Sequence, residues 1–211
     1  MATTEIRQII KAALAKEQAT HQLADKLGQR LPELDTALIL PEKKPLLALM
    51  TFVTDYIESV PGCLNLVSAM SKQLGFQAYA APFIQLAEDY FLQPAAAATA
   101  RDTLEDLLDE AFLAHRVLEE VNDHHIRHTR QPLLPVDMTE ANIIVHHLLG
   151  DSLATRLEQR VQHTASQLWA QQGVWTGLRN VRGSEDAPTM NVFYSEQLGD
   201  PVQHIRLRLG S

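Results

Sequence analysis

The chain has 211 residues, of which 45% are hydrophobic, 21% charged and 6% aromatic, a balance that excludes a disordered polar chain and fits one domain. Its formal net charge of -8 argues against broad attraction to nucleic-acid phosphates or anionic lipid. A single cysteine, Cys63, excludes an internal disulfide, and no stretch reaches the roughly 18 apolar residues of a membrane span. We expect a protein of the reducing cytoplasm without nucleic-acid or membrane partners.

The N-terminal third is expected to hold two helices joined by a linker that contains proline. Apolar residues at spacings of three and four predict a helix over residues 3–31, with a stop near Pro32. Residues 37–40 of the linker are apolar enough for a short strand or a buried extended segment, and their length does not decide between the two. A second helix begins at Pro45, and the pair Pro61-Gly62 is expected to end it.

Three further helical patterns follow in the middle of the chain. Residues 63–91 keep helical spacing, although Gly75 and Pro82 predict a kink or a break. The strongest pattern covers residues 101–128, with acidic residues dense in its first turns. After a short connector, the next helix is expected to begin at Asp137 or Thr139 and to continue as far as Gly173. A short connector makes these last two helices antiparallel neighbours.

The composition changes after residue 173, where loop-forming residues precede an alternating, strand-like tail. Residues 191–194 and 202–209 resemble two strands around a turn, and they must pack on the helices or pair with residues 37–40. The predicted fold is therefore all-α, a bundle of about five to six helices with a small C-terminal β-hairpin or extended tail. We expect one domain over residues 1–211, with the bundle in 1–172 and a loop-rich extension in 173–211.

Histidines cluster in the last two predicted helices. The chain has 9 histidines, and six of them fall within 33 residues, where an even spread gives roughly one or two. The six are His115, His124, His125, His128, His146 and His147. Imidazole is the commonest transition-metal ligand among side chains and carries protons near neutral pH, so the cluster indicates metal or acid-base chemistry.

A metal site is predicted from two pairs of side chains with helical spacing. His115 and Glu119 share one helix face, and His147 and Asp151 are spaced in the same way on the next helix. Antiparallel packing places both pairs at one depth, where they would bind Fe, Mn or Zn. Three carboxylates on earlier helices are candidates to join them: Asp55, Glu58 and Glu88.

Two interpretations without a metal stand beside that site. His115 and His147 also fit core histidines that pair with Glu119 and Asp151 as ordinary neighbours on a helix, or members of an acid-base or small-ligand pocket. The Glu-x-x-His motif of carboxylate-bridged metal bundles is absent, because Asn122 stands three residues after Glu119. No family is assigned on these residues.

Three other histidines are expected to cap a helix end or to lie on a solvated surface, and the cysteine is expected to be structural. His124, His125 and His128 follow Glu119 and other acidic residues near a helix C-terminus, where the dipole and nearby charge should raise the pKa of each imidazole. This helix end should then be better ordered near pH 6 than near pH 8. Cys63 fits a buried structural thiol.

Two function classes follow. The first is a metal-dependent oxidase or oxygenase that uses His115, Glu119, His147 and Asp151 and takes a small apolar substrate. The second is a non-enzymatic ligand-binding or protein-interaction module, which the wide apolar helix faces predict to self-associate as a homo-oligomer. The sequence leaves open whether the chain is an enzyme.

Overall fold

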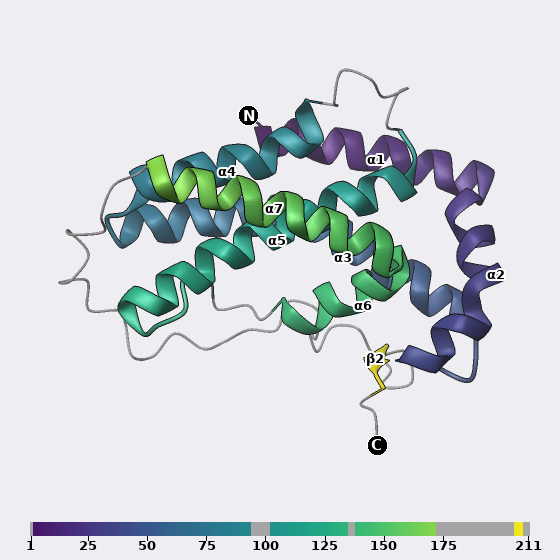
Figure 1. Cartoon of the computed structure of the whole chain (residues 1–211). Coiled ribbons are helices and arrows are strands. Elements are labelled where there is room, and N and C mark those ends of the chain that lie inside the picture. The colour runs from purple at the N-terminus through teal and green to yellow at the C-terminus, as the bar shows by residue number, and fades with distance from the viewer. Residues whose placement is uncertain (1, 94–101, 135–137, 172–204, 209–211) are drawn as a thin grey trace.

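The computed structural model describes residues 2–93, 102–134, 138–171 and 205–208, and they form a helical bundle (Figure 1). The described part holds seven helices, which confirms the all-α prediction but exceeds the predicted five to six. They are α1 (Ala2–Thr20), α2 (Gln22–Ala37), α3 (Pro45–Gln73), α4 (Gln77–Leu92), α5 (Leu104–Thr129), α6 (Thr139–Leu149) and α7 (Asp151–Gln171). Among the described residues, none of the helices is long and apolar enough to cross a membrane.

The single helix predicted over residues 3–31 is wrong, because the chain turns between α1 and α2. His21 adopts the left-handed conformation with φ 53°, so α2 stands across the end of the bundle (Figure 1). The buried Glu17 carboxylate accepts the N–H groups of Leu23 at 3.1 Å and Ala24 at 2.9 Å, which otherwise lack partners at a helix start. The stop expected near Pro32 is also wrong, since α2 continues through it.

Proline proves a weaker signal than expected in α3 and α4 as well. The end expected at Pro61-Gly62 is wrong, because α3 continues to Gln73 with Val60 and Pro61 both buried. Packing of these side chains outweighs the loss of one backbone hydrogen bond. The break predicted at Gly75 is confirmed, with φ 78°, whereas Pro82 lies inside α4 without ending it.

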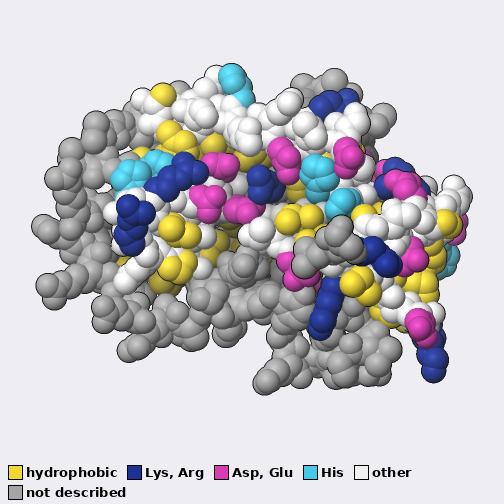
Figure 2. All heavy atoms as spheres, turned by 60° about the horizontal axis from the view of Figure 1, so that its bottom comes forward, with side chains coloured by type: hydrophobic (Ala, Val, Ile, Leu, Met, Phe, Trp, Pro, Cys, Tyr) yellow, Lys and Arg dark blue, Asp and Glu magenta, His cyan; other side chains and the backbone are white. Residues whose placement is uncertain are grey.

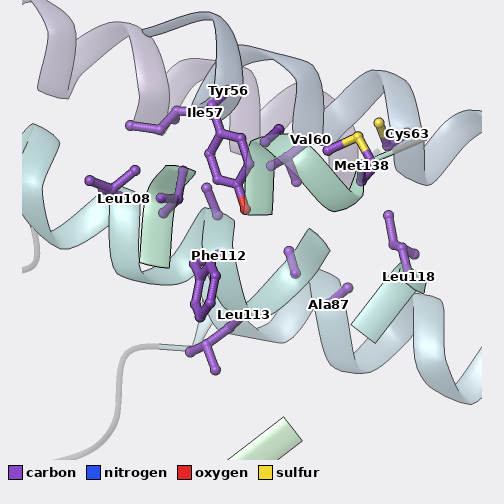
Figure 3. Packing of buried hydrophobic residues seen from close by; sticks show 14 of the residues in the cluster. Tyr56, Ile57, Val60, Cys63, Ala87, Leu108, Phe112, Leu113, Leu118 and Met138 are labelled. Carbon is purple, nitrogen blue, oxygen red and sulfur yellow. The ribbon is translucent and has the colours of Figure 1, made fainter. Parts of the chain in front are cut away.

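The core surrounds α5, which packs against α3, α4 and α7. A capping box between Thr103 and Asp106 fixes the start of α5, close to the predicted position. Tyr56 from α3 and Phe112 from α5 are fully buried and project into the same layer (Figure 3). Helices of the same chain cover the wide apolar face of α5, and self-association stays a prediction.

A small antiparallel pair of strands joins a segment near the C-terminus to the segment that follows α2. The strand β1 (Leu38–Ile39) pairs with β2 (Arg206–Leu207), and Leu38 lies opposite Leu207. This confirms the strand predicted over residues 37–40 and its pairing with the tail. The other predicted strand, residues 191–194, lies outside the described residues.

Candidate functional site

Helices α5, α6 and α7 surround an open pocket of about 270 Å³. Figure 2 shows the face of the bundle that carries α6, with histidine, acidic and basic side chains beside one another over its middle. The lining residues are Arg116 and Glu119 from α5, Thr139, Asn142, Ile143, His146 and His147 from α6, and Asp151 and Glu158 from α7. Most of the lining residues therefore carry polar or charged groups, and these groups come from three helices.

The inner wall of the pocket is tied to the core by Asn142. The side chain of Asn142 is buried, and its Oδ1 accepts the hydroxyl of Tyr56 at 2.7 Å. Its Nδ2 donates to Oε2 of Glu119, also at 2.7 Å. Burial and the Glu119 charge raise the pKa of Tyr56, so the phenol stays a donor. Both ends of the amide are satisfied, which fixes the Glu119 carboxylate in the wall.

Arg116 lies between two carboxylates on different helices. Its Nη1 donates to the same Oε2 of Glu119 that accepts from Asn142. Its Nε lies 3.9 Å from Oε1 of Glu158 on α7, which is beyond hydrogen-bond distance. The Arg116 side chain is 22% exposed, so its hydrogen-bonded pair with Glu119 is partly buried, while Glu158 interacts with Arg116 only across the longer distance.

His146 stands between two carboxylates of α7. Its Nδ1 lies 3.3 Å from Oε1 of Glu158, and its Nε2 lies 3.4 Å from Oδ1 of Asp151. Asp151 and Glu158 are seven residues apart, two helical turns, so they share one face of α7. The Asp151 side chain is 88% exposed and stands at the outer edge of the pocket.

The break between α6 and α7 places these groups. Gly150 has φ 85° and ends α6, so that α7 begins at the next residue in a new direction. The guanidinium of Arg30 from α2 donates to the backbone oxygens of Leu148 and of His147, the latter at 3.2 Å. These contacts satisfy carbonyl groups that a helix end leaves without partners. A distant arginine thereby holds the turn that orients His146 toward Asp151.

The conformation of Gly150 gives a prediction with a control inside the same chain. Gly150→Ala should lower the free energy of unfolding by about 1–3 kcal/mol, because a side chain strains a backbone with positive φ. Gly62→Ala should instead raise it by about 1 kcal/mol, since Gly62 lies inside α3 and an added Cβ meets no atom within 4 Å. Urea unfolding measures both, and equal effects of the two variants would contradict the proposed turn.

The four residues predicted to bind a metal are placed in two different environments. Glu119, His147 and Asp151 line the pocket. His115 lies in the core, with Nε2 at 3.1 Å from both the Ser59 hydroxyl and the backbone oxygen of Tyr56. In the described part of the chain, no three His, Cys, Asp or Glu side chains form a group that could hold a metal ion. None of the three further candidates lines the pocket: Asp55, Glu58 and Glu88.

The expected pairing of His147 with Asp151 assumes one continuous helix, and this assumption is wrong. Because Gly150 breaks the helix, Asp151 contacts the imidazole of His146 and not that of His147. The spacing of residues in the sequence did not indicate the roles of His146 and Glu158, or those of Arg116 and Asn142. The signal that was available is Gly150 itself, since glycine after a run of apolar residues commonly ends a helix.

The direction of the pKa shift expected for His124 and His125, at the end of α5, is wrong. Burial lowers the pKa of His124 to about 4 and also lowers that of His125, because water is excluded from the charged form. His124 stacks on Trp169 at 3.8 Å between ring centroids, and His125 stacks on Phe76 at 5.0 Å. His128 places its Nδ1 2.8 Å from the backbone oxygen of His124, a carbonyl inside α5 and not a free one at its end, so this contact does not cap the helix.

Cys63 is buried and free, as predicted for a structural thiol, and burial raises its pKa to about 11.

Comparison of the chain with protein-family models, with curated proteins and with solved structures gives no match in any of the three. The function is therefore inferred from the pocket between α5, α6 and α7.

Proposed function

We propose that this chain is a helical ligand-binding protein and that the pocket between α5, α6 and α7 is its binding site. The observation that carries the proposal is the convergence of polar side chains from three helices on one cavity of about 270 Å³. Ligand pockets commonly have volumes of about 300–1,000 Å³. A cavity slightly below that range suits a small molecule.

The lining supports a polar ligand in place of the apolar one expected from the sequence. Ile143 is the one aliphatic side chain in the described lining, and the others carry charge or hydrogen-bonding groups. The contacts of Asn142 with Tyr56 and Glu119 hold the inner wall before any ligand arrives. A wall ordered in advance lowers the entropy that binding must overcome.

The test is a thermal-shift screen of small polar molecules against the full chain. A ligand at one hundred times its dissociation constant stabilises a protein by about 2.7 kcal/mol, which raises the Tm of a chain of this size by about 5–10 °C. Ile143→Trp should abolish this shift by filling the pocket, because Ile143 is 40% exposed and lines it. Ile39→Trp is the control, since Ile39 is 46% exposed on β1.

Two results would contradict the proposal. One is a screen in which no compound raises the Tm of the parent chain. The other is a set of compounds whose shift is the same in the parent chain and in the Ile143→Trp variant, which would place binding elsewhere.

A metal-dependent oxidase or oxygenase is the second candidate, because Glu119, His147 and Asp151 line this same pocket. Elemental analysis of the purified protein tests it. Stoichiometric Fe, Mn or Zn that disappears in a His147→Ala variant would favour the enzyme. Metal-free protein that binds a ligand in the screen would favour the binding protein.

We also propose that the protein works in the reducing cytoplasm, an environment that suits the buried free thiol of Cys63.

A further inference from the structure

We infer that the ligand of this pocket is a small organic cation with N–H donors, such as an alkylammonium or a guanidinium compound. The inference rests on the proposed binding function and specifies its ligand class. Three carboxylates line the pocket, from Glu119, Asp151 and Glu158, against one permanently charged cation, Arg116. The net charge of -8 on the whole chain adds to the negative potential that attracts a cation to a partly enclosed site.

The three carboxylates differ in how far their charge is already compensated. Glu119 accepts from both Arg116 and Asn142 at one oxygen, Oε2, so its charge is the one compensated most within the protein. Glu158 and Asp151 contact His146, and Glu158 is 3.9 Å from Arg116 Nε. These two carboxylates on one face of α7 are the acceptors that remain for a ligand. Charge-assisted hydrogen bonds from N–H donors to carboxylates are among the strongest that proteins make.

The arrangement around His146 favours an organic cation over a metal ion. Glu158 faces Nδ1 of the ring and Asp151 faces Nε2, so the imidazole separates the two carboxylates. A metal ion bound to one ring nitrogen binds its carboxylate ligands at about 2.0–2.2 Å. Two carboxylates on opposite edges of the ring cannot both lie that close to the same ion. A cation with donors on separate atoms reaches two acceptors that lie apart.

The arrangement also disfavours an anion. Arg116 is the permanent cation of the lining, and its Nη1 already donates to Glu119. A carboxylate or phosphate entering the pocket would meet three carboxylates against one guanidinium that Glu119 already engages, and like charges at short range repel. His147 also lines the pocket, and its backbone oxygen faces Arg30 of α2.

The experiment is an amide chemical-shift titration of the full chain at low ionic strength with four probes. Methylguanidinium is compared with methylurea, which has nearly the same shape without the charge, and propylammonium is compared with propionate. We expect both cations to bind saturably, with shifts around α6 and α7, and each uncharged or anionic counterpart to bind at least tenfold more weakly. Mn²⁺ and Zn²⁺ are titrated separately.

Three variants assign the binding to the two carboxylates. Glu158→Gln should weaken cation binding tenfold or more. Asp151→Asn should weaken it severalfold and keeps the fold, since Asp151 is 88% exposed and asparagine is equally good at a helix start. Glu5→Gln removes one negative charge from an exposed position on α1 and should leave the affinity within twofold.

Each other outcome overturns the inference and is distinct from failure of the proposed function. Equal or tighter binding of methylurea or propionate, lost in Ile143→Trp, would keep the pocket as a ligand site but exclude a cation as its ligand. Binding of Mn²⁺ or Zn²⁺ alone, lost in Glu158→Gln, would favour the metal-dependent candidate. Absence of cation binding in the parent chain would reject the inference whatever the thermal-shift screen finds.

Discussion

Replacing Asn142 with alanine is expected to lower the free energy of unfolding by about 3 kcal/mol. Asn142 is buried. It accepts a hydrogen bond from the hydroxyl of the fully buried Tyr56 and donates one to Glu119. Its removal takes a partner from both groups at once, and a buried polar group deprived of its hydrogen bond costs about 1–3 kcal/mol. Urea unfolding of the two proteins at pH 7.5 measures the difference.

A double-mutant cycle with Tyr56→Phe separates this hydrogen bond from lost packing. Tyr56→Phe alone removes the hydroxyl that Figure 3 shows at the end of the Tyr56 ring and leaves Asn142 Oδ1 without its donor. The two substitutions together should cost at least about 1 kcal/mol less than the sum of the single costs, because residues in one hydrogen-bond network are coupled. Additive costs, within about 0.5 kcal/mol, would contradict the network.

Acid is expected to destabilise the chain through His115. His115 is fully buried, and exclusion of water lowers its pKa to about 4, against the opposing effect of its hydrogen bond to the Tyr56 backbone oxygen. An unfolded histidine has a pKa of about 6.5, so between these values the unfolded chain takes up a proton that the folded chain refuses. The stability that neutral His115 contributes is full above pH 6.5, and about 3 kcal/mol is lost as the pH falls to 4.

The pH dependence of unfolding isolates this contribution. His115→Gln should reduce the loss of stability between pH 7 and pH 4.5 by about 2 kcal/mol, whatever its effect at neutral pH, since glutamine does not titrate. His163→Gln is the control, because His163 is exposed on α7 and water reaches its imidazole in the folded and unfolded chain alike. The same loss in the His115→Gln variant as in the parent chain would show that other groups cause the acid sensitivity.

Periodic patterns in the sequence were sufficient to predict the helices but not where they end. The apolar spacing over residues 101–128 identified α5, because a helix that buries one face must repeat its apolar residues every three or four positions. Apolar residues at helical spacing also continue past His21 and past Gly150, although the chain turns at both residues. Both turns depend on contacts with distant or buried groups, the carboxylate of Glu17 in one case and the guanidinium of Arg30 in the other.

The candidate site shows the same division between local and tertiary information. The sequence alone indicated that histidines and carboxylates gather in α5 and α6, and three of the four residues chosen for a metal line the pocket. Only the tertiary structure decided that His115 points into the core and that His146, not His147, meets Asp151. A side chain's partner depends on the rotation of its helix about its axis, and the packing of α5, α6 and α7 sets that rotation, because a single glycine resets the register between α6 and α7.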